Sequence, residues 1–451
     1  MKLNYIPKLI LLCIVLTVTS NGQAHPQQAQ QGVVFFETLT LPSTVDDKIR
    51  LDLNYRIMKN FFILTRADDA DNKFEGAYEL SIEIFDQNGS AIDRGIKRQK
   101  IFSDTPRQEF PEIDYIQGGF SFDLHEGEYR FLIRLNDQNS QRRHIDRDRR
   151  VRIEKPDRSK PGIFDIVFIE PVDRFDELDY VQPVNLGGNL FFGQDSRALL
   201  VFSTTSPADD LSTISATVYR REEGRREATE EIFTQEIAAE QIFPNTTVQS
   251  NHTNDKVQYG IYETEDLYIH TALLPMNGKT FEEGQYRFSL SIEEENQPAT
   301  KEKGFRVIWI DKPASLRNLD FAIEMLELIM SESEYRELRR GSSDVRNRKF
   351  HEYWKRKDPN PDTAFNPVMT EFYRRVDYAA REFTTIREQN GARTDRGKIY
   401  IIYGPPTEKD RSLIPGQAPR ETWKYKHLNK KFIFADQSRQ GNYQLVARED
   451  L

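Results

Sequence analysis

The chain has 451 residues, of which 37% are hydrophobic and 30% are charged, a balance typical of a well-hydrated protein with several globular domains. Its formal net charge is −9. Because Asp and Glu outnumber Lys and Arg, the composition excludes the broad basic surface on which general nucleic-acid binding depends.

The first residues have the pattern of a secretory signal. Two lysines precede the apolar run Leu9–Leu16, and small or polar residues follow up to Ala24. The run is much shorter than the roughly 20 residues of a membrane-spanning helix. Cys13, the one cysteine of the sequence, lies inside this run, where it does not suit lipid anchoring. We therefore expect a signal peptide at residues 1–24 and an exported protein, periplasmic or associated with the outer membrane of a Gram-negative bacterium.

A β-rich region is expected next. Residues 25–32 are rich in glutamine and predict a disordered lead-in. From Val33 the sequence alternates apolar and polar residues over short segments, and Asn88-Gly89 is a strong hairpin-turn signal. Short strands with polar loops and no convincing helix predict a β-sandwich-like domain at residues 33–156.

The same pattern returns farther along the chain. Residues 126–131 (EGEYRF) match residues 283–288 (EGQYRF), and IEKP at 153–156 matches IDKP at 310–313, both at an offset of 157 residues. This internal repeat predicts a second β-sandwich-like domain at residues 157–313. Within it, Asn245–Asp255 is hydrophilic and without periodicity, which predicts a long loop.

Helical periodicity begins after Pro313, in a third predicted domain at residues 314–451. The clearest helix starts at Asn366-Pro367, an N-cap followed by proline at the first helical position, and carries an apolar stripe to Phe383. The apolar segment Lys398–Tyr403 predicts a buried strand that ends at Gly404-Pro405-Pro406. Alternating segments near residues 421–425, 432–436 and 441–446 predict further strands. An α+β or α/β domain is expected.

These C-terminal motifs resemble the GWxTD domain found at the C-terminus of exported bacterial proteins. The resemblance rests on FYRRVDYA at 372–379, TDRGKIYIIYGPP at 394–406, ETWKY at 421–425 and FIFAD at 432–436. Ala392 stands where the family usually has its namesake tryptophan. The family supplies no reaction to transfer. Its motif places candidate site residues at Gly391, Thr394, Asp395, Arg396, Gly397, Tyr403, Gly404, Pro405 and Pro406.

The signals for catalysis are sparse. None of the seven histidines has metal-ligand spacing to another ligand, and no nucleophile-elbow, P-loop or dinucleotide-binding motif occurs, so we expect neither a metal nor a cofactor. The best catalytic constellation combines Asp395 and Arg396 with Tyr403 and Gly404 at the far end of the next segment and Glu371 or Arg375 from the preceding helix. The same loop is equally a capped turn that only positions the next element.

Three functional hypotheses follow. The first is a noncatalytic recognition or assembly protein of the cell envelope that binds another envelope protein, with Glu371, Arg375, Trp423 and Tyr425 as possible recognition residues. The second is a hydrolase-like enzyme with its site around Asp395 and Arg396. The third is a polysaccharide-binding protein that uses its β-domains.

Overall fold

The computed structural model describes residues 34–67, 74–103, 115–172, 180–184, 189–205, 213–222, 227–252, 256–294 and 297–451. The predicted signal peptide at 1–24 and lead-in at 25–32 lie outside the described residues.

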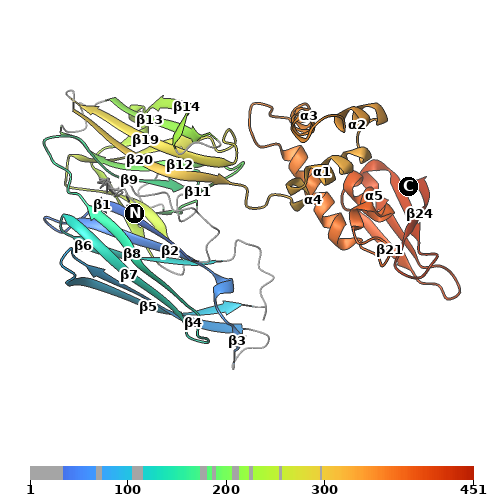
Figure 1. Ribbon diagram of the computed structural model, residues 1–451, viewed down its shortest axis with the longest axis horizontal. Coiled ribbons are helices and arrows are strands. Elements are labelled where there is room, and N and C mark those ends of the chain that lie inside the picture. The colour runs from blue at the N-terminus through green and yellow to red at the C-terminus, as the bar shows by residue number, and fades with distance from the viewer. Residues whose placement is uncertain are drawn as a thin grey trace, which may run out of the picture. The chain divides into compact units, whose positions relative to one another are not determined.

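Two antiparallel sheets form the first β-rich part (Figure 1). One has the order β1-β2-β6, and the other has the order β3-β4-β7-β8 with β5 paired to β4. The predicted Asn88-Gly89 turn joins β4 to β5, and Gly89 has a φ of +82°. The strands are β1 (Val34–Pro42), β2 (Ile49–Met58), β3 (Thr65–Arg66), β4 (Phe74–Phe85), β5 (Ala91–Ser103), β6 (Tyr115–Leu124), β7 (Gly127–Asp137) and β8 (Arg143–Ile153).

The second β-rich part has three sheets, with the orders β15-β18-β12-β9, β11-β20-β19-β13-β14 and β10-β17-β16. Its strands are β9 (Gly162–Ile169), β10 (Tyr180–Val181), β11 (Asn189–Phe191), β12 (Ser196–Ser203), β13 (Thr213–Arg221), β14 (Ala228–Glu236), β15 (Ile242–Phe243), β16 (Thr246–Asn251), β17 (Gln258–Glu263), β18 (Ile269–Met276), β19 (Gly284–Glu294) and β20 (Gln297–Ile308).

The two β-rich parts share a strand arrangement. The order β5-β4-β7-β8 in the first corresponds to β14-β13-β19-β20 in the second, and β1-β2-β6 corresponds to β9-β12-β18. Both EGxYRF segments begin the strand that follows the crossover between sheets, β7 and β19. The two parts therefore have similar strand topology. The internal repeat and the domain boundaries remain predictions.

The sheet β15-β18-β12-β9 is buried on both faces. Leu200 and Phe202 point into a core shared with the sheet of β19 and β20, whereas Leu199 and Val201 belong to the core of the first β-rich part. The continuous apolar run of β12 accounts for this, because a strand covered on both sides has no solvent-facing positions. The expected multidomain, β-sandwich-like fold is confirmed.

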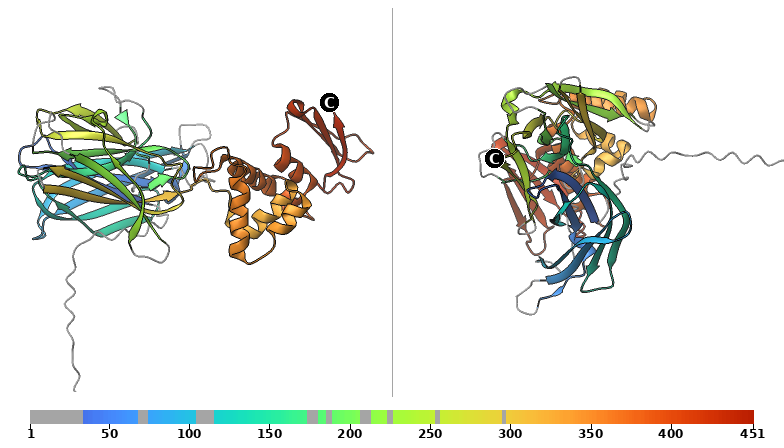
Figure 2. Two further views of the ribbon diagram at one scale, coloured as in Figure 1. Left: turned by 90° about the horizontal axis from the view of Figure 1, so that it is seen from above. Right: turned by 90° about the vertical axis from the view of Figure 1, so that its left-hand side faces the viewer.

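Helices precede a four-stranded antiparallel sheet in the C-terminal part, which is therefore α+β (Figures 1 and 2). The predicted Asn366 cap is present: its side chain accepts a hydrogen bond from the Met369 N–H at 2.9 Å. The elements are α1 (Leu319–Met325), α2 (Glu332–Leu338), α3 (Ser343–Lys355), α4 (Pro367–Glu382), α5 (Asp395–Tyr403), β21 (Glu408–Ser412), β22 (Arg420–Tyr425), β23 (Lys430–Ala435) and β24 (Gln444–Asp450).

Two local predictions were wrong. The segment Lys398–Tyr403 is not a strand but the main part of helix α5, because Thr394 caps a helix here and an apolar run alone does not distinguish a buried helix from a buried strand. The predicted loop Asn245–Asp255 contains strand β16, which pairs with β17. Its polar side chains left no alternation to recognise.

Candidate functional site

The loop before α5 is held by very close backbone packing. A Cβ atom on Gly391 would lie 2.3 Å from the Ala379 carbonyl oxygen, and one on Gly397 would lie 2.0 Å from the Gly391 carbonyl oxygen. Real Cβ atoms do not approach so closely, so both positions require glycine. Thr394 fixes the same turn: its Oγ1 accepts from the Gly397 N–H at 3.1 Å and donates to the Gly391 carbonyl at 2.7 Å.

Asp395 and Arg396, the predicted catalytic pair, point to different partners. Asp395 Oδ2 accepts a hydrogen bond from the backbone N–H of Leu445 in β24, at 2.8 Å. Arg396 Nη1 donates to Glu421 Oε2 at 3.2 Å, and its guanidinium lies 4.5 Å from the centre of the Tyr443 ring. Both side chains thus connect α5 to the sheet formed by β21 to β24.

Glu421 is the centre of a buried charge cluster on β22. Its side chain is 4% exposed and also accepts from Trp423 Nε1 at 2.6 Å and Lys409 Nζ at 2.9 Å. Burial raises the pKa of the Glu421 carboxyl, but the hydrogen bonds from Lys409 and Trp423 and the charges of Lys409 and Arg396 outweigh it and hold that pKa below its ordinary value. Glu421 is therefore an anion in the folded protein at neutral pH.

The other end of α5 is a second tightly packed turn. Gly404 has a φ of +76°, and its carbonyl accepts a hydrogen bond from Tyr425 Oη at 2.9 Å. Burial raises the pKa of Tyr425, so this phenol stays protonated and keeps donating. Tyr403 packs against Tyr425 and Phe432.

The remaining candidates lie beside this turn. The Arg375 guanidinium is 3.1 Å from the position that a Cβ atom on Gly404 would occupy, and Arg375 Nε donates to Glu371 Oε1 at 2.7 Å. Pro405 is exposed and Pro406 half-buried. Glu371 thus pairs along its own helix, and no contact joins it to Asp395 in the described structure.

A comparison with protein families agrees with the resemblance of the C-terminal motifs. Residues 291–451 match the family model described as the GWxTD domain. This chain carries a GWxTD domain. The match begins within β19 and includes all of α1 to α5 and β21 to β24. The namesake position, Ala392, is fully buried in the domain core.

Other comparisons add little. The major pilin subunit BcpA of Bacillus cereus is 10% identical, with 52% of this chain and 69% of that chain covered, and a TM-score of 0.14. The titin Ig tandem domains A164-A165 are 7% identical, with 61% and 96% covered, and a TM-score of 0.12. Neither likeness carries an argument about function. No curated protein matches the chain.

The structure places the candidate residues of the GWxTD domain in two separate groups, one at each end of α5. Gly391, Thr394, Asp395, Arg396 and Gly397 form the first with Glu421, and Glu371, Arg375, Tyr403, Gly404 and Tyr425 form the second. Trp423 and Tyr425, proposed as recognition anchors, are 1% and 0% exposed. Among the described residues, no cluster of His, Cys, Asp or Glu has the geometry of a metal site.

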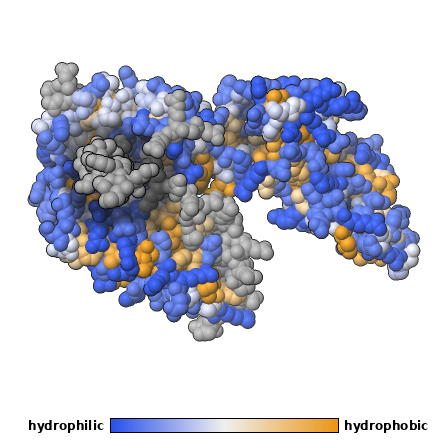
Figure 3. All heavy atoms as spheres, viewed as in Figure 1, coloured by the Kyte–Doolittle hydropathy of each residue, from blue (hydrophilic) through white to orange (hydrophobic). Residues whose placement is uncertain are grey.

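The exposed features of the GWxTD domain were missed by the sequence analysis. Leu413 and Ile414, 63% and 52% exposed, lie in the loop between β21 and β22, which is called the hairpin tip below. The hairpin of β21 and β22 extends away from the helices (Figure 1). In Figure 3 the visible surface of the domain is mostly hydrophilic, with apolar groups scattered over it. Two adjacent aliphatic residues in a polar hairpin could have drawn attention to this tip. None of the helices in the described residues is long and apolar enough to span a membrane.

Proposed function

We propose that the protein is an exported, noncatalytic component of the cell envelope that binds another envelope protein through its GWxTD domain. The observation that carries this proposal is the contrast between the motif and the hairpin tip. The motif side chains bond within the domain, whereas Leu413 and Ile414 are exposed. Apolar side chains with charged neighbours, here Arg411 and Arg420, are typical of the centre and rim of a protein interface.

The hydrolase hypothesis has less support. General acid–base catalysis needs a carboxylate within hydrogen-bond reach of the reacting atom, together with a partner that stabilises developing charge. Asp395 instead accepts from the Leu445 backbone, and Arg396 is bound to the buried Glu421. Their geometry is that of side chains that join α5 to β22 and β24.

Site-specific photo-crosslinking tests the proposed interface in intact cells of the native host. A photoreactive phenylalanine analogue replaces Leu413 in one variant and Leu267 in the control, because Leu267 is 51% exposed in the second β-rich part. We expect a discrete cross-linked protein from position 413 and none from position 267. The double variant Leu413→Ser, Ile414→Ser should lose the complex while keeping the thermal midpoint of the wild type. Identical products from both positions, or none from 413, would contradict the proposal.

A further inference from the structure

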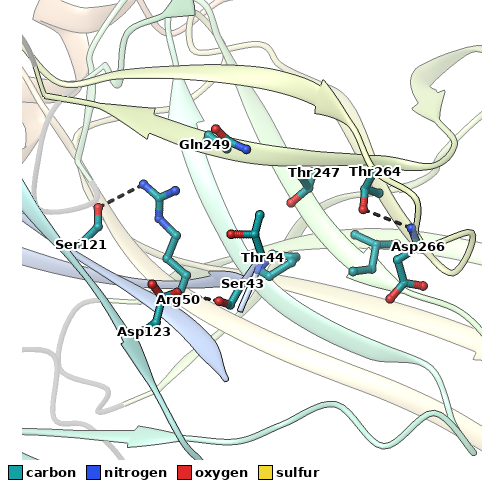
Figure 4. A pocket seen from close by; sticks show the side chains of 11 residues that line it. Ser43, Thr44, Arg50, Ser121, Asp123, Thr247, Gln249, Thr264 and Asp266 are labelled. Carbon is teal, nitrogen blue, oxygen red and sulfur yellow. Dashed lines mark hydrogen bonds between the residues drawn. The ribbon is translucent and has the colours of Figure 1, made fainter. Parts of the chain in front are cut away.

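A polar cavity of about 240 Å³ lies in the β-rich region, and none of its described lining residues belongs to the GWxTD domain. The end of β1, with strands β2 and β6, forms one side, and β16 with the segment after β17 forms the other. Figure 4 shows Ser43, Arg50 and Asp123 on the first side and Thr247, Gln249 and Thr264 across from them. Ligand pockets for drug-sized molecules span ~300–1,000 Å³, so this cavity has room for one small ring rather than an extended chain.

The lining consists almost entirely of hydrogen-bonding groups. Nine of its eleven residues are polar, five of them with hydroxyl groups, and the two others are the aliphatic Pro42 and Ile269. The single cation, Arg50, is already neutralised by the buried carboxylate of Asp52, whose Oδ1 lies 2.9 Å from Arg50 Nε. Among the described lining residues, no unpaired cation is left over for a phosphate or carboxylate. Of the two lining carboxylates, Asp266 pairs with Arg158 at 2.8 Å, and Asp123 remains as a hydrogen-bond acceptor for hydroxyl groups. The lining therefore fits an uncharged ligand with several hydroxyl groups.

One lining side chain has a buried hydroxyl group that makes no hydrogen bond in the described structure. Thr247 is 8% exposed, and its Oγ1 has no hydrogen-bond partner among the described residues. A buried hydroxyl without a partner costs free energy, about 1–3 kcal/mol in general, and a ligand in the cavity that bonded to Thr247 would remove this cost. Of the buried side chains without a partner, Thr247 is the one that lines this cavity in the described structure. Gln249, on the same strand, likewise makes no side-chain hydrogen bond within the described structure.

The other polar groups are held in place before any ligand arrives. Arg50 Nη2 donates to Ser121 Oγ at 3.0 Å and to Ser250 Oγ at 2.8 Å, which ties both sides of the cavity together. Ser43 Oγ donates to Asp123 Oδ1 at 2.6 Å. Fixed side chains lose little conformational entropy on binding, so a small ligand can be held by few contacts.

We propose that this cavity binds one uncharged sugar ring. The carboxylate of Asp123 accepts hydrogen bonds from ring hydroxyls, the Gln249 amide donates and accepts them, and Thr247 gains its missing partner. Pro42 and Ile269 contact the C–H groups of the ring. The ring comes either from a free monosaccharide or from the terminal residue of an envelope polysaccharide, and both present the same chemistry. This binding goes beyond the proposed function, because it uses the β-rich region.

Titration of the full chain with neutral sugars tests the proposal. The probes are glucose, galactose, mannose and N-acetylglucosamine, with glucose 6-phosphate as the charged control, and binding is followed by saturation-transfer NMR. We expect saturable binding of at least one neutral sugar and weaker binding of the phosphate. Thr247→Val and Gln249→Leu should each weaken it about 3- to 10-fold, the effect of one lost hydrogen bond.

Ser196→Ala is the matched control, because Ser196 also has a buried hydroxyl without a partner in the described part of the chain but does not line the cavity. Thr247→Val and Ser196→Ala should both raise the thermal midpoint, and only Thr247→Val should affect sugar binding. A second experiment identifies where the bound sugar ring comes from. If envelope polysaccharide also binds and the monosaccharide displaces it, the ring is the terminal residue of the polymer. If only the monosaccharide binds, the ligand is the free sugar. The proposal is overturned if no neutral sugar binds saturably, or if both cavity variants bind as the wild type does.

Discussion

Glu421 connects three elements of the GWxTD domain through one carboxylate. It receives hydrogen bonds or charge contacts from Arg396 on α5, Lys409 on β21 and Trp423 on its own strand. Because its folded pKa is lowered, this carboxyl binds a proton less readily in the folded than in the unfolded chain. Such a group stabilises the fold above its unfolded pKa, near 4.5, and that stabilisation is lost as the pH falls through the folded pKa.

The pH dependence of unfolding should therefore change in Glu421→Gln. At pH 7 we expect this variant to be less stable by about 3 kcal/mol, because Arg396 loses its buried counter-charge. Below about pH 4.5 the difference from the wild type should shrink. Tryptophan fluorescence during heating measures it, since all three tryptophans lie in or against the C-terminal core. Glu382→Gln, an exposed control on α4, should leave the wild-type pH profile unchanged, and a pH-independent loss in Glu421→Gln would contradict the assigned role.

The start of α5 offers a prediction at the scale of an element. Thr394→Val keeps the shape of the side chain but removes the hydroxyl that caps α5 and bonds to Gly391. We expect a loss of about 1–2 kcal/mol in the free energy of unfolding of the C-terminal part. Thr394→Ser retains the hydroxyl and should lose less than half as much. Equal losses in the two variants, measured by the same fluorescence assay, would show that packing of the methyl group rather than capping stabilises the turn.

Helix α4 could be predicted from the sequence and α5 could not, because only α4 combines a recognisable start with helical periodicity. Asn366 and Pro367 mark the start of α4, and its apolar positions recur at helical spacing. Residues 399–403 are isoleucine and tyrosine only, so they show no periodicity and favour a strand by propensity. The cap at Thr394 and the close approach of Gly397 to Gly391 decide for a helix, and the second of these exists only in three dimensions.

The candidate site was predicted in part for a similar reason. The motif residues around Thr394 were found, but their partner Glu421 was not. Alternation puts Glu421 on the same face of its strand as the buried Trp423 and Tyr425, but the pattern does not identify the cations that accompany a carboxylate there. Its cationic partners lie on other elements, Arg396 on α5 and Lys409 on β21, and only the folded structure brings them to β22. The cavity was missed too: Thr247 and Gln249 lie in a polar segment that had been assigned to a loop.

At the scale of the whole molecule, a buried ionic network connects strands from both β-rich parts. Lys303 on β20 lies 3.0 Å from Glu37 Oε1 on β1 and 3.7 Å from Asp165 Oδ1 on β9. Burial lowers the pKa of Lys303, but the charges of Glu37 and Asp165 outweigh it and raise that pKa above its ordinary value. The amine therefore stays charged, and its two carboxylate partners belong to different sheets.

Lys303→Met should consequently weaken the junction between the two β-rich parts. Removing one member of a buried ion pair leaves its partners uncompensated, and the expected cost is about 3 kcal/mol. In a region of this size, that loss lowers the calorimetric midpoint by about 6–12 °C.

Lys312→Met is the control, because Lys312 pairs with Glu283 at 2.6 Å on the surface, where an ion pair contributes at most about 1 kcal/mol. If the network couples the parts, Lys303→Met should also separate their unfolding into two transitions, whereas the control keeps the wild-type profile. A single transition with an unchanged midpoint in Lys303→Met would mean that apolar packing around Leu199 and Val201 holds the parts together without the ions.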